Sequence, residues 1–508
     1  MLESGVSPQK KTSAAIDAPK LSLGAKLFSF PVMCAFLLAA VIFAYAPRGI
    51  SIGESDIWWH LLNAQNLLQH HSLSRIDTHT FTVAGSPWIS FEWLSEVPFF
   101  LAFRTAGLRE MVVLYSVVMV LIFAAVYYRS CRAGADCKDA AVATLGGVCI
   151  GTVSLAPRTL LFGWLCLTGL LLILDRFRRT GTGLWLLPPL FALWINLHGS
   201  WVYGIAVLAL TVIGGLLAGE WGRVTAHRWR PADLKKLLLA FAASIVALFV
   251  NPFGYKLVWY PFDFLLRQRA IMRGSVYWLP VDFSSWNGKL AMGLIFVVLA
   301  VALFSSSRWR LDEVLLMGFA LWSGLMHMRF LDFAAIIIVP ILAPHLKLFP
   351  PYEPELDKPW LNAAIMAAVV AAVIYFFPSA ASLQRQLDRE YPTAALDFMR
   401  QHHLQGRIFN SVEFGGYMEW NVPELKPFID GRGDIFVYNG TLDDYEAAVD
   451  IKEPFQVLDK YRIDYVFLER TWPLAYLLEH SPGWRLIYSD KVAVLFQHLP
   501  ASGRGRVE

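Results

Sequence analysis

The chain alternates between long apolar runs and short polar or basic segments. A run of about 18 or more apolar residues is long enough to cross the hydrocarbon core of a bilayer as a helix. The pattern predicts about eleven membrane-spanning helices, and residues 27–378 are expected to form the transmembrane domain. The predicted spans are 27–46, 111–128, 139–156, 158–174, 184–198, 200–218, 237–252, 289–305, 312–328, 330–346 and 360–378.

The segments between these spans differ in charge, and the difference predicts an orientation. Residues 1–26 are polar and are expected to form a disordered cytoplasmic tail. Basic residues that follow spans two, four, six and eight fall on the same side as that tail, as expected for cytoplasmic loops. The first external loop is then 47–110 and another, 253–288, follows span seven. The basic residues concerned are Arg129, Arg132, Lys138, Arg176, Arg178, Arg179, Arg223, Arg228, Arg230, Lys235, Lys236, Arg308 and Arg310.

Beyond the last span the pattern changes to regular charges and short apolar runs. Residues 385–500 are expected to form an extracytoplasmic α/β domain, which is large enough to bury its own core. Strands are predicted at Arg407–Asn410, Pro427–Asp430, Tyr465–Leu468, Leu486–Tyr488 and Ala493–Phe496. Helices are predicted at Tyr391–His402, Asp443–Lys460 and Trp472–His480.

Two glycine-rich segments of this domain are predicted as turns. They are Gly415-Gly416-Tyr417 and Asp430-Gly-Arg432-Gly-Asp434. The second would place Arg432 and two carboxylates at a loop tip that faces the membrane. The simpler interpretation, that both segments only connect strands, is favoured by the pattern alone.

Composition supports the membrane class. The chain is 56% hydrophobic and only 17% charged, whereas soluble proteins carry roughly 25% charged residues. Its 19 Trp and 35 Phe residues suit the many boundaries between water and lipid. The net charge of +4 is small for 508 residues and gives no support for nucleic-acid binding. None of the five cysteines lies in a predicted external segment, so disulfides are not expected.

The first external loop opens with a predicted amphipathic helix. Asp56, His60 and Asn63 fall on one face, and Ser51 and Glu54 have the spacing of a capping box. Such a helix at a membrane surface would bury its apolar side and hold a carboxylate at the boundary of the bilayer. The apolar stripe consists of Ile57, Leu61, Ala64 and Leu68.

This loop resembles the first extracytoplasmic loop of the GT-C superfamily of membrane glycosyltransferases, a resemblance that would place the chain in a bacterial branch. Protein O-mannosyltransferases and lipid A aminoarabinose transferases are members. The resemblance is carried by Glu54-Ser-Asp56-Ile-Trp-Trp-His60, Gly85-Ser-Pro-Trp88 and Phe91-Glu92-Trp93-Leu94. The acidic motif of the superfamily is usually Asp-Glu or Asp-Asp, and here it is Glu54-x-Asp56. That departure leaves open which of the two carboxylates is catalytic.

The resemblance implies transfer of a sugar from a polyprenyl-phosphate-linked donor, with inversion at C1, to a glycan, lipid or protein acceptor. Asp56 is then the expected general base, with Glu54 as the alternative, because the phosphate leaves as an anion without a protonating group. His60 would either orient the carboxylate or anchor the helix at the interface. The competing interpretation is that Asp56 only favours the dipole of its helix.

Positive charge is needed around the leaving phosphate. Arg158 and Arg329 lie at the external ends of predicted spans, where an unpaired charge is costly without a function. His198 is placed similarly, although a lone histidine at a helix end is more often structural. The 253–288 loop offers further candidates between aromatic residues, and a plain interfacial helix would show the same pattern: Lys256, Arg267, Arg269 and Arg273.

No cofactor is expected, but a divalent cation stays open because Glu54, Asp56, Asp77 and Glu92 carry suitable ligands. Two other functions stay open as well. A transporter or flippase of a lipid-linked intermediate is disfavoured, since the sequence has no strong internal repeat and its acidic residues lie outside the spans. A non-catalytic GT-C-like assembly protein is the other. The basic tail suggests a multi-pass protein of a bacterial inner (plasma) membrane.

Overall fold

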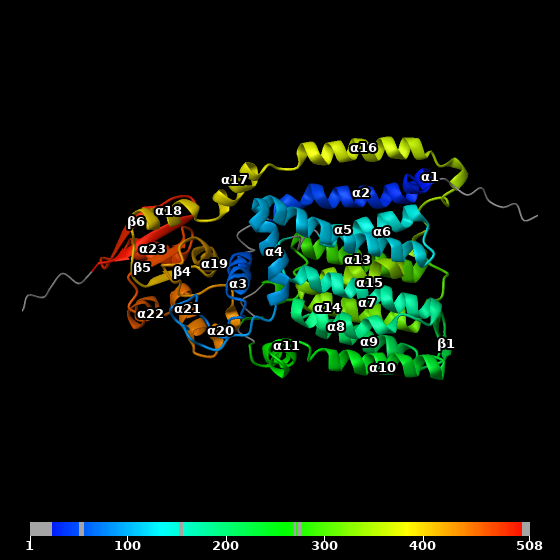
Figure 1. Ribbon diagram of the computed structural model, residues 1–508, viewed down its shortest axis with the longest axis horizontal. Helices are drawn as coiled ribbons and strands as arrows, with labels where there is room; N and C mark the ends of the chain where they lie inside the picture. The colour runs from blue at the N-terminus through cyan, green and yellow to red at the C-terminus, as the bar shows by residue number, and fades with distance from the viewer. Residues whose placement is uncertain (1–22, 50–54, 152–155, 269–270, 273–275, 500–508) are drawn as a thin grey trace, which may run out of the picture.

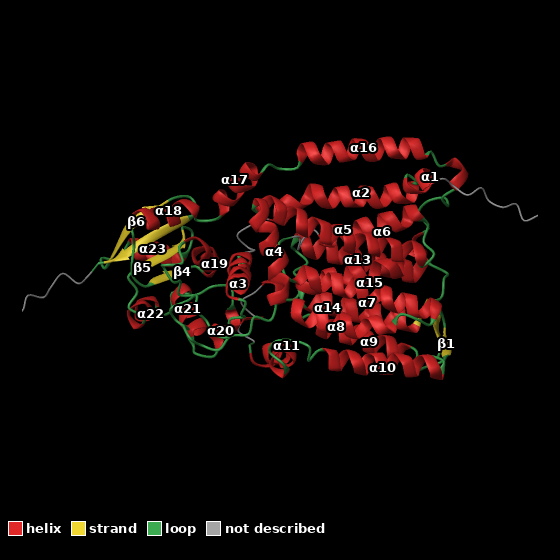
Figure 2. Ribbon diagram, in the orientation of Figure 1, coloured by secondary structure: helices red, strands yellow, loops and turns green. Residues whose placement is uncertain are grey.

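The computed structural model describes residues 23–49, 55–151, 156–268, 271–272 and 276–499. Long helices lie side by side with roughly parallel axes, and the C-terminal domain sits at one end of this bundle (Figure 1). Helices dominate, and the few strands form two small sheets (Figure 2). The expected fold class, a multi-span α-helical membrane protein with a C-terminal α/β domain, is confirmed.

Each of the eleven predicted spans coincides with a helix. Six of the helices, some with an adjoining 3₁₀ turn, are long and apolar enough to cross a membrane, and α8 and α9 are shorter apolar helices. The eleven are α2 (Phe30–Tyr45), α5 (Leu108–Arg132), α6 (Cys137–Gly151), α7 (Leu160–Thr180), α8 (Leu187–Leu197), α9 (Trp201–Gly214), α10 (Pro231–Ala247), α13 (Trp286–Phe304), α14 (Leu311–Met326), α15 (Leu331–Leu346) and α16 (Pro359–Phe376).

Burial separates the centre of the bundle from its edge. Helix α15 is buried along nearly its whole length and packs against α5, α6 and α14. Helix α16, which is equally apolar, buries only Asn362 and packs on α2. A helix that is apolar all round is stable either in a protein core or in lipid. Helix α15 therefore lies in the protein core, and α16 faces lipid.

One end of the bundle carries small elements that the sequence pattern did not predict. They are α1 (Leu23–Leu27), η4 (Leu184–Leu186), η7 (Pro354–Leu356) and a three-stranded sheet of β1 (Gly219–Trp221), β2 (Val224–Ala226) and β3 (Trp309–Arg310). The opposite end carries η1 (Ala46–Gly49), α3 (Asp56–His70), α4 (Trp93–Ala106), α11 (Tyr255–Arg267), η5 (Val276–Trp278), η6 (Met328–Phe330) and α17 (Ala380–Glu390).

Helix α3 starts at Asp56 as predicted, but its surroundings differ from the prediction. It is packed between α4 and α19 of the C-terminal domain, so both of its faces are covered. Ile57, Leu61 and His60 are all buried. The expectation of a helix lying on the membrane surface is therefore wrong. Glu96 and Ser90 contact His60 and Asn63 on the face that the pattern left polar, and α19 of the C-terminal domain packs on the helix as well. Both residues of the predicted capping box, Ser51 and Glu54, lie outside the described residues.

The C-terminal domain is built on a four-stranded sheet of order β4-β5-β7-β6, in which β4 and β5 are parallel and the other pairs antiparallel. Its strands are β4 (Ile408–Asn410), β5 (Tyr465–Glu469), β6 (Trp484–Ser489) and β7 (Ala493–His498), and its helices are α18 (Thr393–Gln401), α19 (Val412–Asn421), α20 (Gly433–Val437), α21 (Thr441–Val449), α22 (Pro454–Lys460) and α23 (Pro473–Glu479).

Four of the five predicted strands are confirmed. The segment Pro427–Asp430 makes only a single bridge, from Pro427 to Ile408. The predicted helix Asp443–Lys460 is two helices, because Pro454 stands at the first position of α22 and a proline favours a helix start over a helix interior.

The Gly415-Gly416 pair is helical, contrary to the predicted turn. It lies in α19, where the missing side chains allow two close approaches. A Cβ atom on Gly415 would lie 2.2 Å from the carbonyl oxygen of Ile429, and one on Gly416 would lie 3.2 Å from that of Ser55. The glycines therefore let α19 pack directly on α3 and on the loop before Asp430.

We expect Gly415→Ala to destabilise the protein by about 1–3 kcal/mol, the usual cost of overpacking. The expected drop in melting temperature of the detergent-purified protein can be compared with that of Gly146→Ala. Gly146 lies in α6 with open space around its Cβ position, so the gain in helix propensity should leave that variant unchanged or slightly stabilised. Equal melting temperatures for the two variants would contradict the close approach.

Candidate functional site

A cavity of about 340 Å³ lies where the helix bundle meets the C-terminal domain. Its size is at the lower end of the range for small-molecule sites. Residues from α3, from the start of α7, from α11 and from the 431–434 loop line it. Among them are seven of the predicted site residues: Asp56, His60, Glu92, Arg158, His198, Arg329 and Arg432.

Asp56 is the first residue of α3, and its side chain lines the cavity. Its Oδ1 accepts a hydrogen bond of 3.2 Å from Trp59 Nε1. The backbone of Gly431 lies against the carboxylate, since a Cβ atom there would overlap Asp56 Oδ1. The C-terminal domain therefore closes over this carboxylate, and a side chain at position 431 would displace the Asp56 carboxylate.

Glu92 is buried and held on both oxygens. Thr159 donates a hydrogen bond of 2.6 Å to its Oε2. His198 Nε2 lies 3.1 Å from Oε1, and His60 Nε2 lies 3.6 Å from Oε2. Burial alone would raise the pKa of Glu92, but the charge and hydrogen bond of His198, with His60 and Thr159, bring that pKa below its usual value. Glu92 is therefore ionised and lies between the imidazoles of His60 and His198.

The Nδ1 atom of each imidazole also contacts a fixed partner. His198 Nδ1 accepts the backbone N–H of Ser200 at 2.9 Å, so its proton is on Nε2, facing Glu92. His60 Nδ1 lies 2.9 Å from Glu96 Oε1, which also accepts from Asn63 at 3.2 Å. Burial would lower the pKa of His60, yet the hydrogen bond and charge of Glu96, with Glu92 and Asp56, raise it. Protonated His60 is thus favoured.

Arg158 and Arg329 bring positive charge to the same cavity. The guanidinium of Arg158 lies 3.9 Å from the ring centroid of Tyr277, and that of Arg329 lies 4.1 Å from the ring of Trp278. Stacking over a ring holds a guanidinium in one plane, which suits recognition of a phosphate or carboxylate.

The remaining candidates of the 253–288 loop do not reach the cavity. Lys256 is exposed on α11. Arg267 is exposed as well, and its Nη1 lies 3.6 Å from Asp263 Oδ1 on the same helix. Arg269, Arg273 and the alternative base Glu54 lie outside the described residues.

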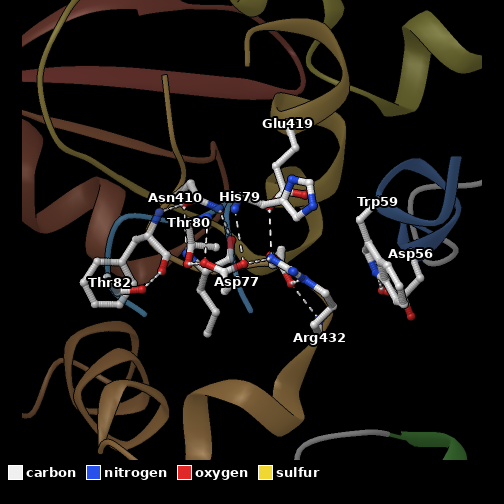
Figure 3. A network of polar contacts seen from close by, with 12 residues as sticks. Asp56, Trp59, Asp77, His79, Thr80, Thr82, Asn410, Glu419 and Arg432 are labelled. Atoms are coloured by element: carbon white, nitrogen blue, oxygen red, sulfur yellow. Dashed lines mark hydrogen bonds and ion pairs between the residues drawn. The ribbon is translucent and has the colours of Figure 1, made fainter. Parts of the chain in front are cut away.

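Arg432 is the buried cation of a polar cluster that joins the first external loop to the C-terminal domain (Figure 3). Its Nη2 lies 2.8 Å from Asp77 Oδ1 and 3.7 Å from Glu419 Oε1, and it pairs with Asp430 as well. The guanidinium lies 4.8 Å from the ring centroid of Trp88. Arg432 Nη1 has no hydrogen-bond partner among the described residues. The turn-rich segment is thus more than a connection between strands.

The pKa values of the ionisable groups in this cluster are shifted in different directions. Burial would raise the pKa of Asp430, but the charge and hydrogen bonds of Arg432 lower it. Burial and the charge of Asp430 raise the pKa of Glu419 well above its usual value. Burial, with Arg432, lowers the pKa of His79 to about 4. One cation is therefore balanced mainly by Asp430 and Asp77, while Glu419 is protonated and His79 is neutral.

Glu96 and Tyr260 were not among the predicted site residues, and Asp434 was named only as a carboxylate of the turn-rich segment. Glu96 follows Glu92 by four residues, and a second carboxylate one turn along an otherwise apolar helix was a usable signal. Tyr260 and Asp434 hydrogen-bond each other across the boundary between α11 and the C-terminal domain. Their pairing spans more than 170 residues and has no local signal.

Among the residues that are described, no group of three or more His, Cys, Asp or Glu side chains is placed to hold a metal ion. Asp77 is engaged by Arg432, and Glu92 by two imidazoles. The described residues therefore offer no set of ligands for the divalent cation that the sequence left open.

Comparison with known protein families and with curated proteins finds no match, whereas solved structures do match. One is the archaeal oligosaccharyltransferase AglB from Archaeoglobus fulgidus in complex with an inhibitory peptide and a dolichol-phosphate, with a TM-score of 0.51, 14% identity, and coverage of 93% of this chain and 74% of that chain. The apo form of the oligosaccharyltransferase from Archaeoglobus fulgidus matches with a TM-score of 0.50, 12% identity, and coverage of 92% and 75%.

At these identities the likeness shows the fold. AglB is a GT-C membrane glycosyltransferase, so the resemblance stated from the first external loop is confirmed at the level of the fold. The chain is a multi-span membrane protein whose fold is like that of the archaeal oligosaccharyltransferase AglB.

The pH dependence of stability provides a test of the contact at Asp434. Burial raises the pKa of this carboxyl to about 7, although Tyr260 and Arg432 oppose the shift. An aspartate in the unfolded chain has a pKa of about 3.9. The folded state therefore holds the proton more tightly, and the stability associated with it is complete below about pH 4 and lost as the pH rises to about 7.

We expect Asp434→Asn to remove this loss, so its melting temperature relative to that of the wild type should rise between about pH 4 and pH 7. Each unit of difference in pKa corresponds to about 1.4 kcal/mol. The exposed Asp459→Asn provides a matched control and should follow the wild type at every pH. Parallel curves for Asp434→Asn and the wild type would contradict the assigned pKa.

Proposed function

We propose that the protein transfers a sugar from a polyprenyl-phosphate-linked donor to an acceptor at the external face of the membrane. The observation that carries this proposal is the single cavity that contains Asp56 together with Arg158 and Arg329. A carboxylate beside two guanidinium groups provides both a base for the acceptor and positive charge for the leaving phosphate. The fold supports the donor class, because AglB was solved with a dolichol-phosphate.

Asp56 is the proposed general base. Its carboxylate takes the proton of the acceptor as the acceptor atom attacks C1 of the sugar. The bond from C1 to the acceptor forms on the face opposite the breaking bond from C1 to the phosphate oxygen. The electron pair of the broken bond stays on the phosphate, so the leaving group needs no acid.

Glu92 is less suited to that role because its oxygens already face Thr159, His198 and His60. We assign Glu92 and His198 as positioning residues that hold the cavity wall. His60 lies one turn after Asp56 on α3 and is locked between Glu92 and Glu96. Its buried position favours orientation of α3 over anchoring at a lipid interface.

Arg158 and Arg329 are proposed to bind the donor phosphate. The negative charge of that group grows as the sugar leaves, so fixed cations stabilise the transition state more than the bound donor. The flat, stacked guanidinium groups suit two parallel hydrogen bonds to phosphate oxygens.

The proposed orientation places the cavity outside the cell. The 47–110 loop, α11 and the C-terminal domain all lie at one end of the bundle, and the basic loops lie at the other (Figure 1). Basic loops are retained in the cytoplasm of bacteria. This arrangement supports a bacterial inner membrane protein with a cytoplasmic N-terminus and an extracytoplasmic C-terminal domain of about residues 385–500.

We expect Asp56→Asn to reduce transfer by about 10²–10⁴-fold, the usual contribution of a general base. Proteoliposomes would receive a panel of labelled polyprenyl-phosphate sugars together with extracts of the cell envelope, and release of polyprenyl phosphate would be measured. This readout does not require the acceptor to be known.

The exposed Asp388→Asn is a matched control, and circular dichroism would verify that each variant is folded. Full activity of Asp56→Asn would refute base catalysis by this residue. Movement of labelled lipid across the bilayer by the wild type, with no release of phosphate from any donor, would instead establish a flippase.

We expect Arg329→Gln to lower kcat/KM for the donor by about 10- to 100-fold, as for loss of a hydrogen bond to a charged group. Arg48→Gln is the matched control. Arg48 also lies over an aromatic ring, that of Tyr45 at 4.9 Å, but it does not line the cavity. An equal loss in both variants would show that the effect is structural.

A further inference from the structure

A second cavity, of about 520 Å³, lies at the opposite end of the bundle, near β3 and between α5, α7, α14 and α15. Six arginines contribute to its wall: Arg129, Arg132, Arg178, Arg179, Arg308 and Arg310. The proposed glycosyl transfer uses none of them, since the two cavities lie at different ends of the spans.

Four of these arginines are paired with carboxylates. Arg129 Nε lies 2.6 Å from Asp175 Oδ2, and Arg308 Nη1 lies 2.8 Å from Glu220 Oε1. Arg178 and Arg310 share Asp312, and Arg310 also approaches Glu313 at 3.8 Å.

Arg132 and Arg179 form no ion pair with any described residue. Their side chains are exposed at the mouth of the cavity. Six arginines thus face four carboxylates, which leaves an excess of two positive charges at one opening. Positive charge at the mouth of a cavity favours an anionic phosphate group.

The inner part of the cavity is apolar. Its wall includes Leu171, Leu316, Ile337, Pro340 and Ile341, and Ile337 is 1% exposed. A cavity with cations at its mouth and aliphatic side chains behind them suits a molecule with an anionic head and a hydrocarbon tail.

Orientation of the protein in the membrane does not account for this arrangement. The positive-inside rule needs basic residues in loops and does not require them to share a cavity. Arg129 and Arg178 are largely withdrawn from solvent, with side chains 9% and 18% exposed. Withdrawing charges from water is costly, and Asp175 and Asp312 offset that cost for these two arginines. Arg132 and Arg179 then carry the excess charge at the mouth of the same cavity.

We propose that this cavity binds the phosphate of an anionic phospholipid from the leaflet opposite the catalytic cavity. Arg132 and Arg179 contact the phosphate at the mouth. One acyl chain lies along the apolar wall formed with α15. The bound lipid fills the space between α5, α7, α14 and α15 and stabilises the bundle by mass action.

The test uses the full-length protein in a neutral detergent. Dioleoylphosphatidylglycerol, dioleoylphosphatidylcholine or inorganic phosphate is titrated while the melting temperature is followed. Phosphatidylglycerol should stabilise the protein saturably, and phosphatidylcholine and phosphate should not. The double variant Arg132→Gln/Arg179→Gln should weaken the apparent affinity for phosphatidylglycerol by about tenfold per arginine.

The matched control is Arg176→Gln/Lys235→Gln, which removes the same charge from exposed positions near this end that do not line the cavity. It should bind phosphatidylglycerol like the wild type. An equal loss in both double variants, or equal stabilisation by the two lipids, would overturn the proposal. Saturable stabilisation by inorganic phosphate alone, abolished in Arg132→Gln/Arg179→Gln, would assign the site to a soluble phosphate and refute the lipid.

Discussion

The neutralisation of one buried cation, Arg432, ties the two halves of the protein together. A guanidinium withdrawn from water is stable only beside carboxylates, and those carboxylates come from distant parts of the chain. Asp77 belongs to the first external loop, whereas Asp430 belongs to the C-terminal domain. Satisfying this charge seats the C-terminal domain on α3 and brings the backbone of Gly431 against the Asp56 carboxylate.

Two carboxylates of the resulting cavity, Glu92 and Asp56, lie in different surroundings. Glu92 is locked between two imidazoles and keeps its charge because they oppose the cost of burial. Asp56 lines the cavity and accepts a hydrogen bond from Trp59. A carboxylate held between two imidazoles positions other groups, whereas one that lines a cavity can meet an acceptor there. This difference in surroundings, more than the acidic motif itself, supports Asp56 as the base.

Arginine side chains have different partners at the two ends of the bundle. At the end that holds the proposed site, Arg158 and Arg329 lie over the aromatic rings of Tyr277 and Trp278. At the other end most arginines are held by carboxylates, and the excess charge gathers at the mouth of an apolar cavity. Stacking leaves a guanidinium charge available for a substrate, whereas ion pairing fixes it as part of the structure.

The sequence by itself determined the eleven helices, the start of α3, four strands of the C-terminal sheet and the residue types of the cavity, since each rests on a local period or a neighbouring motif. It also named seven residues that the cavity contains. Only the tertiary structure decided that Gly415 and Gly416 lie in a helix, that Lys256 and Arg267 stay outside the cavity, and that Tyr260 meets Asp434. Those outcomes depend on contacts between segments up to hundreds of residues apart, where chain packing and the pairing of buried charges select one arrangement among many that the local pattern allows.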